Sequence, residues 1–270
     1  GYKRVLMVAP TGSGKTIMSL AVESLCLEKG TRVGFITSGR QLILQKADRA
    51  TTGGLPFSVL MDRSGYPDFD CLTDFMIVSK DTLKHRKKKM LFSHPTVWIV
   101  DECDVAISPV WREMLSKAKF VLGLTATPVT GKDKGLGFFY DAIVEVATYQ
   151  EMIDSKRLVD IPEGKLFSPY RPYLTGMGGS LDYNSAQLGG RMNSAQIVGD
   201  VVNEWVKHGE DLKTAAFCVN KEHTAHVTDR FNAAGINARF IVDDTPQSER
   251  DDIFAETENG QNKIIVNCAV

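Results

Sequence analysis

Short hydrophobic runs alternate with longer amphipathic stretches from Lys3 to Pro162. The runs are rich in β-branched and apolar residues, and they predict strands at 5–9, 32–36, 75–78, 97–101 and 120–124. Two of the stretches between them, 15–28 and 41–50, predict helices. Strands that are apolar along their whole length are usually buried on both faces. The pattern therefore predicts an α/β fold, with a parallel sheet flanked by helices.

The pattern is interrupted between Gly164 and Ser194, where glycine, proline, serine and tyrosine are frequent. We interpret this stretch as a domain boundary with a mobile loop and no regular element. Beyond it the alternation resumes, with helices expected at 195–208, 222–234 and 247–255 and strands at 214–219, 238–242 and 263–267. The sequence thus predicts two α/β domains, at 1–163 and 194–270, joined by a linker at 164–193. The second domain ends on a strand and is expected to be incomplete.

Composition and charge restrict the choice of partners. Hydrophobic residues make up 43% of the chain and charged residues 24%, which is ordinary for a globular protein, and the formal net charge is -1. There is no global basic field, so any contact with nucleic acid must come from a local patch. No apolar run approaches the roughly 18 residues that a membrane span needs, and no membrane partner is expected.

The cysteines indicate the redox compartment. Five cysteines lie far apart, with neither CxxC spacing nor a pairing with nearby histidines. This usage predicts a reducing, intracellular setting. We assign it to the cytoplasm, of a phage-infected or bacterial cell, and leave a nucleus open.

A glycine-rich segment connects the first predicted strand to the first predicted helix. It has the order of a Walker A phosphate-binding loop, although Ala9 stands where the general pattern has its first glycine. Glycines let successive backbone N–H groups converge on phosphate oxygens, and the following helix adds the positive end of its dipole. Lys15 would reach the outer phosphates, and the Thr16 hydroxyl would bind magnesium. The residues expected to bind ATP are Pro10, Thr11, Gly12, Ser13, Gly14, Lys15 and Thr16.

Two carboxylates end the strand predicted at 97–101, at the edge of an open α/β sheet where ligands bind. Asp101 can hold magnesium through water, and Glu102 can orient and deprotonate the water that attacks the γ-phosphate. An acidic strand end alone is usually a turn, but the phosphate-binding loop in the same domain favours ATP hydrolysis. We therefore predict ATP and Mg²⁺ as cofactors, Thr16 and Asp101 as metal ligands, and Lys15, Asp101 and Glu102 as catalytic residues.

A third segment, at 122–128, reads Leu-Gly-Leu-Thr-Ala-Thr-Pro. It resembles motif III of superfamily 2 helicases, as 101–104 resembles their motif II. The resemblance extends over nearly the whole chain and is closest to the RadD-like, Ssl2-like and phage helicases. It implies two RecA-like P-loop NTPase domains that bind ATP and magnesium between them and a nucleic-acid strand across both. It also implies that Thr125 and Thr127, through Asp104, couple the ATP state to the grip on that strand.

Weaker segments agree with this resemblance. In the first domain, residues 36–42 resemble motif Ia and residues 78–83 resemble the next strand-binding segment. In the second domain, residues 216–220 resemble motif IV, residues 245–250 resemble the Thr-to-Glu-Arg segment that follows motif IV, and residues 264–270 resemble the start of motif V. The first two, 36–42 and 78–83, could also be plain strand-to-helix junctions. The resemblance implies a nucleic-acid partner and favours single-stranded or branched DNA. The residues it assigns to nucleic-acid contact are Arg40, Gln45, Ser79, Thr82 and Asn220.

The chain also departs from the family. Asp104 stands where motif II of these relatives commonly has histidine, so assignment to a DEAD or DEAH subgroup is left open. The adenine-reading glutamine motif would precede Gly1, and motif VI with its arginine finger would follow Val270. We expect further sequence on both sides, including additional domains beyond Val270.

The densest positive cluster is the run from Lys84 to Lys89. It is either a solvated helix or loop, or an electrostatic contact to a phosphate backbone whose affinity falls with salt.

Three functions remain open at this point. They are a helicase that separates strands, a DNA-dependent ATPase that translocates or remodels without separating them, and a nucleotide-binding module without turnover. A small-molecule kinase also has a phosphate-binding loop, but the segment at Thr125 and the second α/β domain argue against it. The sequence leaves the choice of DNA or RNA, the polarity and the oligomeric state open.

The expected place of motif VI leads to a prediction about rate. Because an arginine finger contributes about 10³ to 10⁵ in rate, we expect this chain to bind ATP but to hydrolyse it slowly. ATP turnover in the presence of single-stranded DNA measures this, and a rate typical of a complete helicase would contradict it.

Overall fold

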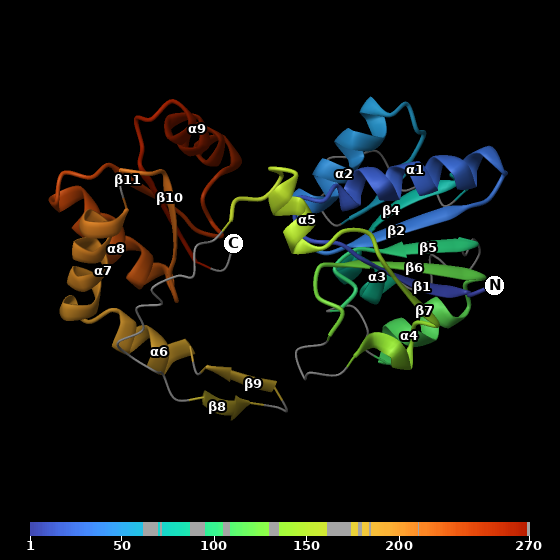
Figure 1. Ribbon diagram of the computed structural model, residues 1–270, viewed down its shortest axis with the longest axis horizontal. Helices are drawn as coiled ribbons and strands as arrows, with labels where there is room; N and C mark the ends of the chain where they lie inside the picture. Colours follow the sequence, from blue (N-terminus) through green and yellow to red (C-terminus); the bar gives the residue numbers. More distant parts are fainter. Residues whose placement is uncertain are drawn as a thin grey trace. The chain divides into compact units, whose positions relative to one another are not determined.

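Figure 1 shows the computed structural model of the chain, which describes residues 1–61, 70, 72–86, 95–104, 109–129, 135–160, 174–177, 180–183, 185–209 and 211–268. The chain divides into two compact units, Gly1–Lys165 and Leu166–Val270. Both contain a parallel sheet with flanking helices, which confirms the predicted α/β class.

The first unit is built on a seven-stranded sheet in the order β3-β4-β2-β5-β6-β1-β7, in which every neighbouring pair is parallel. Its strands are β1 (Arg4–Val8), β2 (Val33–Thr37), β3 (Ser58–Leu60), β4 (Phe75–Ser79), β5 (Val97–Val100), β6 (Phe120–Thr125) and β7 (Ala142–Glu145). Its helices are α1 (Lys15–Glu28), α2 (Arg40–Thr52), α3 (Lys80–Arg86), α4 (Pro109–Ser116), α5 (Tyr149–Asp154) and the 3₁₀ helix η2 (Leu136–Phe138). The five predicted strands and two predicted helices are confirmed.

Each face of this sheet has its own hydrophobic core. Helices α1 and α2 cover one face, and α3 and α4 cover the other (Figure 1). Because successive strand residues point to opposite faces, Phe75 and Ile77 of β4 pack with α1 and α2. Met76 and Val78, between and beyond them, join the core under α3 and α4. This double burial explains why the strands are continuous apolar runs in the sequence.

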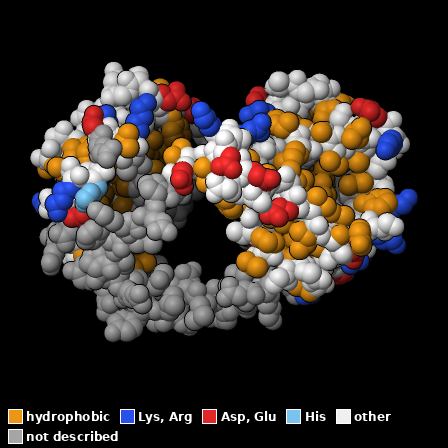
Figure 2. Space-filling view, in the orientation of Figure 1, with side chains coloured by type: hydrophobic (Ala, Val, Ile, Leu, Met, Phe, Trp, Pro, Cys, Tyr) orange, Lys and Arg blue, Asp and Glu red, His pale blue; other side chains and the backbone are white. Residues whose placement is uncertain are grey.

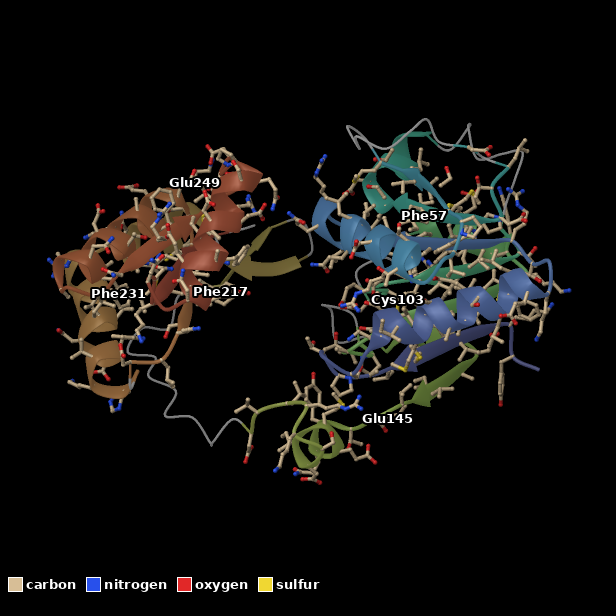
Figure 3. The ribbon with its side chains drawn as sticks, turned by 90° about the horizontal axis from the view of Figure 1, so that it is seen from above. Phe57, Cys103, Glu145, Phe217, Phe231 and Glu249 are labelled. Carbon is tan, nitrogen blue, oxygen red and sulfur yellow. The ribbon has the colours of Figure 1, made fainter. Side chains whose placement is uncertain are left out.

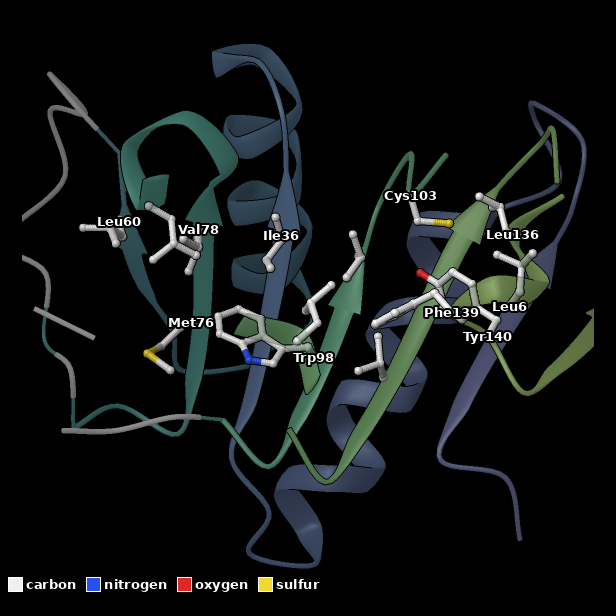
Figure 4. Close-up of a cluster of buried hydrophobic side chains, with 14 residues drawn as sticks. Leu6, Ile36, Leu60, Met76, Val78, Trp98, Cys103, Leu136, Phe139 and Tyr140 are labelled. Atoms are coloured by element: carbon white, nitrogen blue, oxygen red, sulfur yellow. The ribbon is translucent and has the colours of Figure 1, made fainter. Parts of the chain in front are cut away.

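The widest side chain of the second core is Trp98, which is fully buried on β5 (Figure 4). The register of the sheet places it opposite Gly34 on β2. A Cβ atom built on Gly34 would overlap the Trp98 ring. The absence of a side chain at position 34 therefore makes room for the indole in the centre of the sheet.

The second unit has a three-stranded parallel sheet in the order β10-β12-β11 and a two-stranded antiparallel sheet of β8 and β9. Its core gathers around Phe231 of α8, whereas Phe217 of β10 is 82% exposed (Figure 3). Its elements are β8 (Leu174–Met177), β9 (Ser180–Tyr183), α6 (Ser185–Met192), α7 (Ala195–His208), β10 (Thr214–Phe217), α8 (Lys221–Ala233), β11 (Ala238–Ile241), α9 (Gln247–Glu258) and β12 (Ile264–Asn267).

The expectation that 164–193 contains no regular element is wrong. The β8–β9 hairpin and helix α6 lie within this stretch. The glycines that suggested a loop are compatible with these elements, because a hairpin needs a tight connection and Gly189 of α6 accepts the close approach of the Asn220 side chain. In the part of the chain that the structure describes, no helix is both long and apolar enough to cross a bilayer.

We predict that Gly34→Ala destabilises the first unit by about 1 to 3 kcal/mol, because the added methyl group must displace the buried Trp98 ring. Gly137→Ala is the matched control, since a Cβ at that position meets no atom within 4 Å. Urea unfolding monitored by tryptophan fluorescence measures both. Equal midpoints for the two variants would contradict the proposed packing.

Candidate active site

Four neighbouring strands deliver the predicted chemical groups to one edge of the first sheet. Strands β2, β5, β6 and β1 are consecutive and parallel, so their carboxyl ends meet there. The backbone holds the segments beyond these ends together. The N–H of Ala9 donates to the Thr125 carbonyl at 3.0 Å, and the N–H of Cys103 donates to the Leu124 carbonyl at 3.1 Å. The segment after β6 thus lies between the phosphate-binding loop and the acidic segment.

The phosphate-binding loop turns at two glycines with left-handed backbone, Gly12 with φ 80° and Gly14 with φ 91°. Side chains rarely adopt this conformation, so the two positions require glycine. Helix α1 begins at Lys15. The Lys15 ammonium donates to the carbonyls of Ala9 at 3.1 Å and Pro10 at 3.3 Å. The lysine is therefore held over the loop whose amides would receive a phosphate.

A cavity of about 370 Å³ contains this loop and the acidic segment together. The residues predicted to carry the chemistry all line this cavity, although about 85 positions separate one pair from the other. They are Lys15, Thr16, Asp101 and Glu102. Helix α2 closes another side, so Gln45, which was assigned to nucleic acid, lies in the wall of this cavity. The lining residues are Thr11, Gly12, Gly14, Lys15, Thr16, Ile17, Leu42, Gln45, Arg49, Asp101 and Glu102.

Asp101 is largely enclosed, and its surroundings influence its charge. The Thr37 hydroxyl donates to Oδ2 at 3.3 Å. Burial raises the pKa of Asp101, whereas this hydrogen bond, the Glu102 backbone and the ammonium groups of Lys15 and Lys46 oppose the rise. Burial has the larger effect, so the pKa of Asp101 stays above its ordinary value, and these four groups limit the rise.

Glu102 has an unusual backbone, with φ 45°, outside the range that most side chains prefer. Burial raises the pKa of Glu102, the neighbouring Asp101 adds to the rise, and Lys15 opposes it. A carboxylate whose pKa is raised accepts a proton more readily than an ordinary glutamate. This property suits a general base that activates water.

Asp104 connects the acidic segment to the end of β6. The Thr125 hydroxyl lies 3.1 Å from Asp104 Oδ1 and the Thr127 hydroxyl lies 3.4 Å from Oδ2. The Thr125 oxygen also accepts from the Thr127 N–H at 3.0 Å. Thr125 is fully buried. The three residues that were expected to couple ATP to the strand therefore form one hydrogen-bonded group, while their role in coupling stays a prediction.

A buried thiol lies behind this group. The Tyr140 hydroxyl points toward the Cys103 sulfur (Figure 4). A Cβ on Gly123 would collide with that hydroxyl and lie 2.9 Å from the sulfur, so Gly123 makes room for both groups. Burial raises the pKa of Cys103 to about 12, which keeps the thiol protonated.

The other residues predicted to contact nucleic acid in the first unit lie at two strand-to-helix junctions. Arg40 is the first residue of α2. Ser79 and Thr82 lie at the junction of β4 and α3, and both are buried. The Ser79 hydroxyl accepts from the Thr82 N–H at 3.4 Å, so it serves as a local cap of the helix. The geometry assigns the Ser79 side chain a structural function, and the nucleic-acid contact of both residues stays a prediction.

In the second unit, Asn220 caps helix α8, because its Oδ1 accepts from the N–H of His223 at 2.8 Å. Arg250, in the segment resembling the Thr-to-Glu-Arg box, donates to the carbonyls of Thr245 at 3.0 Å and Val242 at 2.7 Å. Both side chains fix loops of this unit.

The basic run is only partly covered. Lys87, Lys88 and Lys89 lie outside the described residues, and of Lys84 to Arg86 only the helical backbone is described. On the face drawn in Figure 2, the described lysines and arginines of the first unit are scattered along its margins. This distribution agrees with the net charge of -1.

The site and the fold together have the arrangement of a RecA-like P-loop unit. A glycine-rich loop with lysine and hydroxyl faces two carboxylates across one cavity, and β6 separates the strands that carry them. This strand order places the end of β6, with the polar residue Thr125, between the phosphate-binding loop and the acidic segment.

Comparisons with known proteins agree with this class. Residues 1–130 match the family described as "Type III restriction enzyme, res subunit". A 51.5 kDa protein of a Lactococcus phage is 27% identical over 97% of this chain and 54% of its own length. The putative ATP-dependent helicase IRC3 of Saccharomyces cerevisiae is 26% identical over 100% of this chain and 42% of its own length. The chain spans about half the length of the curated relatives it matches.

Among solved structures, yeast Dbp5 bound to RNA and ADP BeF3 has a TM-score of 0.57 and 12% identity, covering 98% of this chain and 66% of Dbp5. Dbp5 bound to Gle1 has a TM-score of 0.53 and 13% identity, covering 99% of this chain and 65% of Dbp5. At such identity the likeness concerns the fold alone. Taken together, the motifs, the family match and the relatives confirm the resemblance to superfamily 2 helicases, and the fold is RecA-like.

We predict that Asp104 and Thr125 stabilise the first unit jointly. Asp104→Ala and Thr125→Val should show an interaction energy of about 1 kcal/mol in a double-mutant cycle, because each removes the same hydrogen bond. The cycle of Asp104→Ala with Thr127→Val should give a smaller value, since that contact is longer and exposed. Urea unfolding measures both cycles, and additivity of the first would contradict the prediction.

Proposed function

We propose that the chain is the ATP-hydrolysing core of a motor that moves along or unwinds nucleic acid, with single-stranded or branched DNA as its partner. One observation carries the proposal: Lys15, Thr16, Asp101 and Glu102 line a single cavity at one edge of the sheet. The printed name of the yeast relative, a putative ATP-dependent helicase, supports the motor assignment.

The residues present fit ATP and magnesium. The turns at Gly12 and Gly14 direct backbone N–H groups toward a phosphate, and Lys15 exchanges its contacts with the loop carbonyls for phosphate oxygens. Thr16 and Asp101 are the oxygen donors that would hold magnesium, a hard cation that prefers such ligands. A magnesium ion held by these residues would neutralise charge on the outer phosphates. Glu102 accepts the proton of the attacking water.

Asp104, Thr125 and Thr127 transmit the state of this site in the proposed mechanism. The strand end of β6 touches both the phosphate-binding loop and the acidic segment through its backbone, so a displacement of either is felt at Thr125. Arg40, at the start of α2, would contact the strand by charge.

Glu102→Gln is expected to retain ATP binding and to lower ATP turnover by about 10² to 10⁴, because only the general base is lost. Lys15→Ala is expected to lose nucleotide affinity as well, since its ammonium is the main positive charge of the loop. Titration with a fluorescent ATP analogue and a phosphate-release assay separate the two effects. Lys29→Ala, at the exposed far end of α1, is the control.

Unaltered nucleotide affinity in Lys15→Ala would exclude the proposed site. Stimulation of turnover by single-stranded DNA and by RNA identifies the partner, and an unwinding assay on forked and annealed substrates distinguishes a helicase from a translocating ATPase. A chain that binds ATP without any turnover would instead be a nucleotide-binding module.

A further inference from the structure

A buried ion pair connects helices α1 and α2 behind the candidate site. Lys46 Nζ of α2 lies 2.8 Å from Glu23 Oε2 of α1, and the two side chains are 1% and 0% exposed. The ammonium also lies 4.1 Å from the centre of the Phe35 ring. Burial raises the pKa of Glu23 to about 7 and lowers that of Lys46, while each partner's charge opposes these shifts.

Stability alone does not account for this pair. Removing two charges from water is costly, and well-packed apolar residues in the same places often stabilise a protein equally well or better. The surrounding core of α1, α2 and the sheet is apolar and could accept such residues. The pair is therefore explained by something that only an ammonium group can do at this place.

The ammonium makes a specific contact with the first turns of α1. Lys46 Nζ donates to Ser19 Oγ at 2.7 Å, and Ser19 Oγ donates to the Thr16 carbonyl at 2.8 Å. The lysine uses the lone pair of the Ser19 oxygen and thereby directs the hydroxyl proton to Thr16. Lys46 also acts electrostatically on Asp101. Both residues assigned to magnesium are thus within its influence.

We propose that Lys46 is a positioning residue for the magnesium end of the nucleotide site: through Ser19 it fixes the turn that carries the Thr16 hydroxyl, and Glu23 holds the ammonium in place. This inference rests on the proposed function and deepens it. Partners that orient metal ligands from outside typically contribute 10- to 100-fold to metal affinity.

Two variants test the route. Ser19→Ala removes the connection and leaves the ion pair, and Glu23→Leu with Lys46→Met replaces the pair by apolar side chains. The Mg²⁺ concentration for half-maximal binding of a fluorescent, non-hydrolysable ATP analogue is expected to rise about tenfold in both. Affinity for the same analogue in EDTA is expected to stay within about twofold, because the loop and Lys15 are untouched. If the pair were merely structural, the variants would change the unfolding midpoint but not the Mg²⁺ concentration for half-maximal binding.

The matched controls are Ser24→Ala, which removes another hydrogen-bonded hydroxyl on α1, and Glu113→Leu with Lys117→Met, which replaces an exposed pair at the end of α4. Both should keep the wild-type Mg²⁺ requirement. An unchanged Mg²⁺ requirement in Ser19→Ala overturns the inference. If the double variant Glu23→Leu with Lys46→Met does not fold, the result for Ser19→Ala decides alone. If the wild type itself binds the analogue without any dependence on Mg²⁺, the proposed function fails first.

Discussion

The parallel pairing of β5, β6 and β1 is the constraint on which the site depends. Its register puts Thr125 beside Val8 and Gly123 beside Val100, so β1 and β5 end within two residues of each other along β6. Two backbone hydrogen bonds, from Ala9 and from Cys103 to the end of β6, extend that order beyond the sheet. A shift of β6 by one residue would separate the phosphate-binding loop from the acidic segment, because side chains on a strand alternate between faces.

Much of this arrangement could be predicted from the sequence. The strands are buried on both faces and therefore stand out as apolar runs, and the turn chemistry of Gly12 and Gly14 is local. The carboxyl ends of parallel strands share one edge of the sheet. The proximity of Lys15 and Asp101 follows from this general property. The hydrogen bonds of Asp104 with Thr125 and Thr127 became expected once the family resemblance was recognised.

What could not be predicted depends on how helices pack. Gln45 and Arg49 line the candidate site because α2 lies beside α1, and no local pattern in the sequence indicates that contact. Lys46 has the sequence appearance of a surface charge on an amphipathic helix, yet it is buried against Glu23. Strand β7 was missed because an edge strand with exposed Ile143 and Val144 does not read as a buried run. The hairpin within 164–193 was missed because glycine is frequent in loops and hairpins alike.

The enclosure of Cys103 has a chemical consequence. A thiol beside catalytic carboxylates would ordinarily be a point of attack for peroxide or alkylating agents, since the thiolate is the reactive species. Here the sulfur is 0% exposed, its proton is retained, and the Tyr140 ring shields it. An oxidant that modifies the partly exposed Cys26 or Cys218 would therefore spare the residue whose damage would disturb the acidic segment. A sulfur atom can lie directly behind the acidic segment because burial keeps its thiol protonated and out of reach of solvent.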